Sequence, residues 1–277
     1  MVESAPGTLY VVSTPIGNMG DFSFRGVEVL RSVSLILAED TRHVRKLLDH
    51  YGIAARVAAY HEHNEARSAA ACLRRLAGGE NIALVSDAGT PLLSDPGGRL
   101  VSAAANAGIA VTPIPGASAL LAALVVSALA ASSFTFHGFL PRKGTGRREM
   151  LSEIAECEHV SIIYEAANRL LATLSDLTEA CGPDRACVVA RELTKLYEEV
   201  RRGTLTDLSE YYDKSPARGE IVILIGGAVI ESRDNSSLKQ IASLLVAQGL
   251  STRDVVSIMV RDHGVPRNLA YRMARDS

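Results

Sequence analysis

Short apolar runs alternate with longer segments of helical periodicity through the first half of the chain. The apolar runs predict strands at residues 8–13, 35–38, 57–59, 82–86 and 110–113. The segments between them repeat apolar residues at helical spacing, at 25–32, 41–50, 65–77 and 95–107, and residues 117–128 predict a further helix. Strands that alternate with helices indicate a mostly parallel sheet covered by helices.

A stretch of small residues, 128–133, separates this pattern from a second one and predicts a hinge. Beyond it, strands are expected at 134–139, 160–164, 186–190, 197–203 and 220–227, with helices near 147–155, 168–181 and 206–212. The charges in YEEVRRG, residues 197–203, indicate a partly exposed antiparallel strand. The pattern predicts a second α/β domain.

The last part of the chain is polar at first and then helical to its end. One helix is expected at 238–248, a second with Ser251 as its N-cap, and a third that begins at Pro266 after the break at Gly264. Short helices about a glycine turn resemble a helix-turn-helix unit. A structural cap and a nucleic-acid contact both remain open. The predicted domains are therefore 1–130, 131–229 and 230–277.

Composition narrows the class of protein. The chain has 277 residues, 47% of them hydrophobic, which is enough to form hydrophobic cores. Its net charge is −2, so its overall charge does not favour binding to a polyanion. The four cysteines form no CxxC pair and are expected to be reduced thiols. The first residues lack a signal peptide, which predicts a cytoplasmic protein. The uncharged stretch 116–136 is expected to contain a buried helix rather than a membrane span.

The sequence SDAGTPLLSDPG, residues 86–97, follows a buried strand and is the first candidate binding loop. Loops at the carboxyl ends of parallel strands bind ligands in open α/β sheets. This loop carries Asp87 and Asp95 but no lysine or arginine, so it suits a ligand with hydroxyls or a positive centre rather than a phosphate. We expect Asp95 to cap a helix with Pro96 in its first turn, and residues 87–91 to face a ligand.

Other strand ends carry further candidates. The loop STPIGNMGDFSFR, residues 13–25, matches neither GxGxxG nor a Walker loop, and a binding loop and a plain turn both remain open. Asp40 or Thr41 is expected to cap a helix, and Asp40 beside Arg42 could equally orient a substrate. His61 and His63 have HxH spacing, but no third ligand has a recognisable spacing, so no metal site is predicted.

Charged and glycine-rich segments complete the set. The basic run Arg142, Lys143, Arg147 and Arg148 could meet phosphates or form a solvated loop. A Pro-Gly turn, IPGASA at residues 114–119, ends another strand. Tyr164-Glu165 and Gly219-Glu220 lie at ends of strands and could line a cleft.

Taken together, these motifs closely resemble the tetrapyrrole methylase family, and within it the members that act on ribosomal RNA. The resemblance rests on TPIGNMGD, LAEDTRHVRKLL, YHEHNE, SDAGTPLLSDPG, PGASA, FHGFLPRKG, YEAANRL, RELTKLYEE and GEIVILIGG, which run from residue 14 to 227. It implies two α/β domains with S-adenosylmethionine in a cleft between them, in a homodimer. It also implies methylation of the ribose 2′-hydroxyl of a cytidine in the decoding region of 16S rRNA, within the small ribosomal subunit, with no membrane and no DNA partner.

The resemblance assigns roles by position. It implies that the cofactor is held by Asp87, Ala88, Gly89, Thr90, Pro91, Pro115, Gly116, Ala117, Ser118, Tyr164, Glu165, Gly219, Glu220 and Ile221. It implies that the RNA faces Thr14, Pro15, Gly17, Asn18, Gly20, Arg42, Arg142 and Lys143. A base must take the 2′-hydroxyl proton, and the candidates are Asp40, His63 and Asp21.

One motif departs from the family pattern. YEAANRL stands where the relatives commonly have Y-E-S-P-H-R-L, so a role carried by that histidine is in doubt, and Asn168 is expected to cap the following helix instead. A tetrapyrrole (precorrin) methyltransferase and a non-catalytic RNA-binding or ribosome assembly protein remain as alternatives. The basic run favours RNA, and the retained SDAGTP and PGASA loops favour catalysis.

Overall fold

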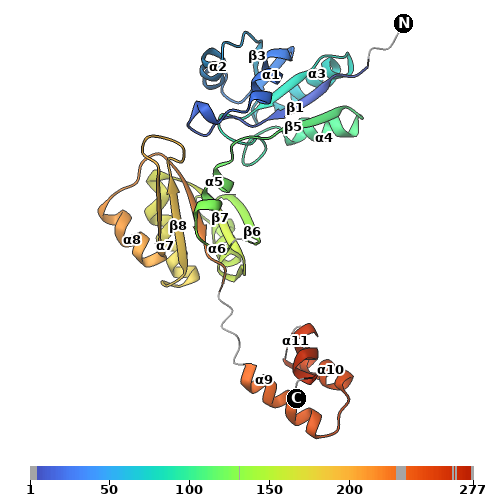
Figure 1. The fold of residues 1–277 in the computed structure, drawn as a ribbon, viewed down its shortest axis with the longest axis vertical. Helices are drawn as coiled ribbons and strands as arrows, with labels where there is room; N and C mark the ends of the chain where they lie inside the picture. Colours follow the sequence, from blue (N-terminus) through green and yellow to red (C-terminus); the bar gives the residue numbers. More distant parts are fainter. Residues whose placement is uncertain (1–4, 131, 229–234, 264, 266, 276–277) are drawn as a thin grey trace. The chain divides into compact units, whose positions relative to one another are not determined.

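The chain forms two compact units, Met1–Ala228 and Val229–Ser277, each described by itself below. The protein is described from a computed structural model, in which residues 5–130, 132–228, 235–263, 265 and 267–275 are described. The α/β class with a helical C-terminal part is confirmed (Figure 1). The predicted division of the chain at residues 130 and 229 stays a prediction.

Five parallel strands form the first sheet of the larger unit, in the order β3-β2-β4-β1-β5. Their bounds are β1 Thr8–Val12, β2 Leu35–Ala38, β3 Val57–Ala59, β4 Ile82–Val85 and β5 Ala110–Ile114. One apolar core joins the sheet to α1 (Phe24–Ser32) and α2 (Thr41–His50), and another joins it to α3 (Glu65–Ala77) and α4 (Gly98–Asn106). Because helices cover both faces, β2 and β4 are continuous buried apolar runs, as the sequence predicts.

The strand order brings three loops to one place. Strand β1 lies between β4 and β5, so the loops that follow these three strands leave the sheet side by side at its carboxyl edge. Open α/β sheets bind ligands at such a point, where consecutive connections diverge to opposite sides. The three loops are the TPIGNMGD, SDAGTP and PGASA motifs of the sequence.

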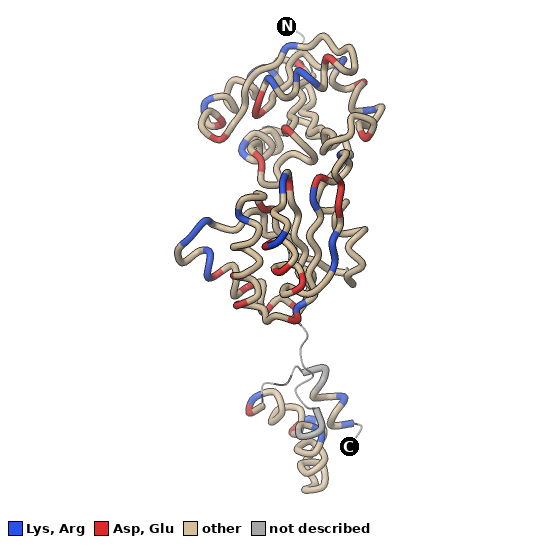
Figure 2. The backbone as a smooth tube through the Cα atoms, turned by 90° about the vertical axis from the view of Figure 1, so that its left-hand side faces the viewer, with Lys and Arg blue, Asp and Glu red and all other residues tan. Residues whose placement is uncertain are grey.

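The second sheet of this unit is mixed, in the order β6-β7-β10-β8-β9. Its strands are β6 Phe134–Phe139, β7 Val160–Ala166, β8 Ala186–Arg191, β9 Glu199–Thr204 and β10 Glu220–Ile225. Only β6 and β7 pair in parallel. Strand β9 is an antiparallel edge strand, which confirms the interpretation of the charged YEEVRRG run. Acidic and basic residues are interspersed along the backbone of this unit (Figure 2).

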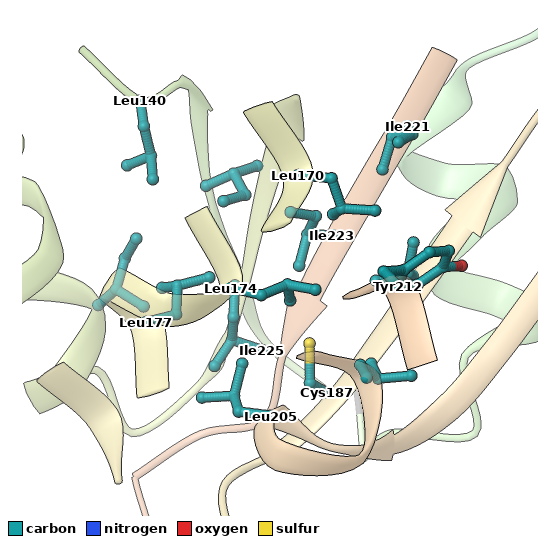
Figure 3. Packing of buried hydrophobic residues seen from close by; sticks show 14 of the residues in the cluster. Leu140, Leu170, Leu174, Leu177, Cys187, Leu205, Tyr212, Ile221, Ile223 and Ile225 are labelled. Atoms are coloured by element: carbon teal, nitrogen blue, oxygen red, sulfur yellow. The ribbon is translucent and has the colours of Figure 1, made fainter. Parts of the chain in front are cut away.

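One face of the second sheet packs on three helices, α6 (Thr145–Glu156), α7 (Leu170–Cys181) and α8 (Leu205–Lys214). Leucines of α7 and α8 interdigitate with isoleucines of β10 there, and Cys187 and Tyr212 complete the core (Figure 3). The predicted cap of α7 is wrong: Asn168 is exposed within the short helix η2 (Ala167–Arg169), and α7 begins at Leu170 without a side-chain cap.

The other face of the second sheet packs on α5 (Ala119–Val126) and on Ile16 from the loop after β1. This contact joins the two sheets of the larger unit through an apolar core. Residues 116–136 contain helix α5, but the expectation of a buried helix is only half right: Leu120, Ala123 and Leu124 are buried, whereas Leu121, Val125 and Val126 are exposed. Within the described residues, no helix combines the length and the apolar character needed to cross a membrane.

The described residues of the smaller unit form three helices, α9 (Asn235–Ala247), α10 (Thr252–His263) and α11 (Arg267–Arg275), which share a core around Val255, Met259 and Met273. Ser251 caps α10, as predicted, because its hydroxyl accepts the Asp254 backbone N–H at 3.3 Å. The predicted break at Gly264 and the predicted helix start at Pro266 lie outside the described residues.

Candidate functional site

A cavity of about 490 Å³ lies between the first sheet's carboxyl edge and the second sheet. That volume is within the range of small-molecule sites. Its walls come from residues of the SDAGTP loop, from the start of α5, and from the ends of β7 and β10. Among the described residues that line it, none is a lysine, arginine or histidine. The cavity is therefore suited to a ligand that is neutral or positively charged.

Hydrogen bonds hold the three loops of the first sheet together at this cavity. Thr14 and Gly89 exchange two backbone hydrogen bonds, of 2.9 and 3.1 Å. Thr90 Oγ1 donates to the Ala117 carbonyl at 3.1 Å and accepts from Ser13 Oγ at 3.2 Å. Because backbone and hydroxyl groups are paired across the loops, the wall is fixed without a ligand.

Three carboxylates from the first half of the chain line the cavity: Glu39, Asp87 and Asp95. Burial, followed by repulsion from Glu39 and Asp87, raises the pKa of Asp95 to about 6. Burial and the Asp87 charge also raise the pKa of Glu39. Asp87 Oδ1 accepts the Asp40 backbone N–H at 3.0 Å, which fixes its orientation. This acidic wall has a negative field that a cation would relieve.

The expected capping role of Asp95 is wrong. Helix α4 begins at Gly98, and its N-cap is Gly97, whose φ of 127° is a conformation that favours glycine. The carboxylate of Glu65, at the start of α3, accepts from the N–H groups of Gly97 and Arg99 at 3.1 Å each. Since Glu65 satisfies the start of α4, the Asp95 side chain is left to the cavity.

A buried hydroxyl in the cavity wall has no partner among the described residues. Ser118 is 9% exposed, and its Oγ makes no hydrogen bond. Buried polar groups in native proteins are nearly always paired, so an unpaired one at a cavity indicates a place for a ligand's polar atom. Ser118 was predicted from sequence as a ligand-binding residue.

The opposite wall of the cavity includes residues of β7. Tyr164 and Glu165, both predicted to bind the cofactor, are neighbours on this strand, so their side chains point to opposite faces of the sheet. Tyr164 faces the apolar core with α5, beside Phe136 and Phe139 at ring-centroid distances of 4.9 and 5.6 Å. The Glu165 carboxylate points to the other face of the strand. It forms an ion pair with Arg169 at 3.2 Å and accepts from Thr173 Oγ1 at 2.6 Å, with its side chain fully buried. Glu165 thus lines the cavity while its carboxylate is already paired inside the domain.

A second cavity, of about 280 Å³, adjoins the first and shares Ile16, Asp87, Ala88 and Glu220 with it. Its lining carries three basic side chains, His43, Lys46 and Lys195, besides the shared carboxylates Asp87 and Glu220. The two cavities therefore differ in charge: one has an acidic wall, and the other carries basic groups that suit an anionic partner.

The structure gathers most of the predicted cofactor-binding residues. The first cavity is lined by Asp87, Ala88, Gly89, Thr90, Ser118, Tyr164, Glu165, Gly219, Glu220 and Ile221. The others lie in the same loops behind its wall, and they are Pro91, Pro115, Gly116 and Ala117. A side chain at Gly116 would collide with Ser13, since an added Cβ would be 2.9 Å from that residue's Cβ.

The predicted RNA-facing residues fall into two groups. Thr14, Pro15 and Gly17 line the second cavity, and Asn18 and Gly20 continue the same loop, where Asn18 Oδ1 accepts the Gly20 N–H at 2.9 Å. Arg42, Arg142 and Lys143 are exposed and line neither cavity. Within the predicted basic run, Arg147 is a structural residue, because it pairs with Asp176 at 2.6 Å and is 11% exposed.

The three candidate bases lie outside both cavities. Asp40 caps α2, as one of the two sequence interpretations has it, and hydrogen bonds from Arg42 lower the pKa of its carboxyl to about 2. His63 is 83% exposed beside Glu62, and Asp21 is exposed in the short helix η1 (Met19–Asp21). These three assignments stay predictions that the geometry does not support. The described residues contain no group of three or more side chains able to hold a metal ion.

Sequence reasoning missed Glu39, Asp95 and Leu193 as cavity residues. A signal was available for two of them. Glu39 directly follows the buried strand β2, and Asp95 stands in the same loop as Asp87 without a neighbouring cation. Leu193 belongs to a motif, RELTKLYEE, to which the sequence assigned no role.

Comparison with known proteins gives a consistent result. The profile of the Tetrapyrrole (Corrin/Porphyrin) Methylases matches residues 8–209. A protein of Xylella fastidiosa (strain Temecula1) named Ribosomal RNA small subunit methyltransferase I is 47% identical over 270 residues, which cover 97% of this chain and 99% of the relative. The protein of that name from Synechocystis sp. is 45% identical over 271 residues, covering 97% of each chain.

Solved structures are similar in fold. Uroporphyrin-III C-methyl transferase from Thermus thermophilus, complexed with S-adenyl homocysteine, superposes with a TM-score of 0.57 at 18% identity. The match covers 80% of this chain and 98% of that one. At this identity the likeness concerns the fold alone.

Proposed function

Because the chain belongs to the tetrapyrrole methylase family, we propose that it is an enzyme that transfers a methyl group from S-adenosylmethionine to RNA of the small ribosomal subunit. The relatives that carry the ribosomal RNA name match nearly the whole chain, at 39–47% identity for those compared. We further propose that the acceptor is the ribose 2′-hydroxyl of a cytidine in the decoding region of 16S rRNA. A homodimer, which the family resemblance implies, and a cytoplasmic location belong to the same proposal.

The residues of the first cavity fit S-adenosylmethionine. The observation that carries this assignment is the combination of an acidic wall without a cation and the unpaired hydroxyl of Ser118. S-adenosylmethionine supplies a methyl group on a positively charged sulfur and carries amino and hydroxyl groups that need partners. Asp87 and Asp95 would offset the positive charge, Ser118 would pair with a polar group, and Tyr164 would close the apolar side.

The second cavity suits the RNA side of the reaction. It adjoins the first at Ile16, Asp87, Ala88 and Glu220, so a group bound there lies next to a ligand in the acidic cavity. Lys46 and His43 would face the phosphates of an RNA strand, beside Lys195, which is paired with Glu192 and Glu220. Transfer then depends on the fixed loops holding acceptor and donor in line, which lowers the barrier because the entropy of bringing the two groups together is lost on binding.

The test uses labelled S-adenosylmethionine and small ribosomal subunits from a strain that lacks the enzyme. We expect label in 16S rRNA, at one cytidine, on the ribose, as shown by resistance of the following phosphodiester bond to alkali. Label in a precorrin and none in RNA would favour the tetrapyrrole alternative. Absence of S-adenosylmethionine binding by calorimetry would favour the non-catalytic alternative.

A further inference from the structure

The loop between β8 and β9, residues 192–198, borders three cavities formed by described residues of the larger unit. Leu193 lines the acidic cavity and Lys195 lines the basic one. Glu192 and Tyr197 line a third cavity, of about 390 Å³. The loop is the centre of the RELTKLYEE motif, and neither the donor site nor the acceptor cavity accounts for its outer residues.

Ion pairs and hydrogen bonds hold this loop in one conformation. Lys195 Nζ bridges Glu192 Oε1 at 2.9 Å and Glu220 Oε2 at 3.0 Å. The Thr194 N–H donates to Glu198 Oε2 at 2.6 Å. A loop with this many internal bonds presents its exposed side chains at little further entropic cost.

Contacts with two glycines also fix the place of the loop. The Asn18 N–H donates to Thr194 Oγ1 at 3.1 Å, and an added Cβ at Gly17 would be 2.4 Å from Lys195 Cγ. An added Cβ at Gly219, whose φ is 86°, would be 2.2 Å from Glu192 Oε1. A side chain at either position would displace the Lys195, Thr194 or Glu192 side chain from its place in this loop.

The loop keeps a strained backbone. Glu192 has a φ of 50° and Thr194 a φ of 67°, in the left-handed region that residues with a Cβ rarely adopt. Thr194 is β-branched, which makes this conformation still less favourable. Strain of this kind persists where surrounding structure over-determines it, and it is concentrated at functional sites.

This strained loop displays two large apolar side chains to solvent. Leu196 is 88% exposed and Tyr197 is 69% exposed, whereas the neighbouring Leu193 is buried. Beside Tyr197, the third cavity is lined by Tyr211, by Tyr212 with an unpaired buried hydroxyl, and by the exposed Arg218. An arginine already stacks on an aromatic ring here, with Arg201 Cζ 3.5 Å from the Tyr211 ring centroid.

We propose that the loop 192–198 is an RNA-docking element, in which Tyr197 stacks on an unpaired base next to the target nucleotide while that nucleotide occupies the basic cavity. The inference rests on the proposed function. Exposed aromatic rings beside arginines are how proteins hold unpaired bases, and each stacked base adds measurable affinity.

The charges that have no ion-pair partner favour RNA over an acidic protein partner. In the third cavity, Glu199 is paired with Arg191 and Arg201, and Glu192 with Lys195, which leaves Arg218 without an ion pair among the described residues. The second cavity is lined by Lys46 and His43 as well as by Asp87. A strand that runs from the basic cavity to the third cavity would therefore meet cations in both, with the Tyr197 ring beside Arg218 in the third.

The experiment compares the full-length wild-type protein with Tyr197→Ala, Tyr197→Phe and Leu196→Ala. Val125→Ala is the matched control, since Val125 is also a solvent-exposed aliphatic residue (79% exposed) and lines none of the three cavities. The probes are small ribosomal subunits from a strain lacking the enzyme, for binding and methyl transfer, and S-adenosylmethionine alone, for calorimetry.

Tyr197→Ala is expected to weaken subunit binding and raise KM by about 5- to 150-fold. Tyr197→Phe should stay within about 2-fold, because a phenyl ring also stacks. The Kd for S-adenosylmethionine and the melting temperature should not change. The two readouts separate this inference from the proposed function. If the wild-type protein failed to methylate RNA, the proposed function would be wrong. The inference about Tyr197 would still be decided by comparing subunit binding of the wild-type protein and Tyr197→Ala, because that binding is measured directly.

Equal subunit binding by the wild-type protein and Tyr197→Ala would overturn the inference. If the molar mass of Tyr197→Ala in sedimentation equilibrium also differed from that of the wild type, this surface would be a contact between protein chains instead.

Discussion

Thr14 and Gly89 exchange a pair of backbone hydrogen bonds that join the loop after β1 to the loop after β4. The pairing lies at the boundary between the two cavities, since Thr14 lines the basic one and Gly89 the acidic one. It therefore couples the geometry of the proposed donor site to that of the proposed acceptor site.

Replacing Gly89 should disturb both sites. Gly89 has a φ of 82°, and an added Cβ would be 3.2 Å from Ile16 Cγ2. Gly89→Ala is expected to lower the free energy of unfolding by about 1–2 kcal/mol, measured by urea denaturation. It should also weaken S-adenosylmethionine binding measured under conditions where the variant is folded. The control is Gly52→Ala, at a positive φ of 60° with open space around it, which should cost stability without a change in binding.

The ionised Asp95 carboxylate should lower the stability of the fold and strengthen the binding of S-adenosylmethionine. Its folded pKa of about 6 lies above the model-compound value of 3.8, so the native state holds the proton more tightly than the unfolded state. Stability is therefore lost as the pH rises through this window, and Asp95→Asn should be more stable than wild type at pH 7.5, by about 1 kcal/mol after allowance for solvent screening. The difference should disappear near pH 4, as followed by thermal unfolding.

The same substitution should weaken binding of the donor. At pH 7.5 the ionised Asp95 attracts a cation, so Asp95→Asn should raise the Kd for S-adenosylmethionine about 3- to 10-fold. Wild-type affinity should fall as the pH drops below 6, and the variant should show a flatter profile. Asp21→Asn removes an exposed carboxylate that lines no cavity, and a similar loss of affinity in that control would contradict a local effect of Asp95.

Ser118→Ala should separate ligand binding from folding. The Ser118 hydroxyl is buried and unpaired in the absence of ligand, so its removal should leave the melting temperature unchanged or slightly higher. If the hydroxyl pairs with the donor, its loss should raise the Kd for S-adenosylmethionine about 3- to 10-fold in calorimetry. An unchanged Kd would show that the ligand does not use this hydroxyl.

Glu165→Gln should lower stability and leave ligand affinity nearly unchanged, the opposite of what is expected for Ser118→Ala. The Glu165 carboxylate is fully buried and paired with Arg169 and Thr173, so the variant should lose about 2 kcal/mol of unfolding free energy in urea. We expect less than a 2-fold change in S-adenosylmethionine affinity at temperatures where the variant is folded. A large change in affinity with normal stability would instead indicate a direct contact with the ligand. Thr173→Val is a second variant that removes the partner and keeps the carboxylate.

The contrast between Asp95 and Glu165 shows what the sequence could and could not predict. Periodicity identified the strands and helices because each has a buried face, and strand order brought the quoted loops together as expected for an α/β sheet. The pattern SDPGG matches a helix start, but the start of α4 is satisfied by Glu65, which is 32 positions from Gly97. No local pattern indicates a partner that distant, so the cavity role of Asp95 was missed.

Glu165 shows that the sequence does not reveal which face of a strand lines the cavity. The resemblance assigned the whole Tyr164-Glu165 pair to the cofactor, although successive side chains of a strand point to opposite faces. In the structure Tyr164 packs toward α5 and Glu165 toward α7. Choosing between the two faces requires knowing which helix covers which side of the sheet, and sequence periodicity alone does not show this.

A crystal structure of the protein with S-adenosylmethionine tests the central claim most directly. We expect the ligand in the cavity lined by Asp87, Ser118 and Tyr164, with Ser118 Oγ in hydrogen-bond contact and the methyl group directed toward the cavity that contains Lys46 and Lys195. A ligand bound in the cavity of Tyr211 and Tyr212, or one whose methyl group faces away from the basic cavity, would contradict the account.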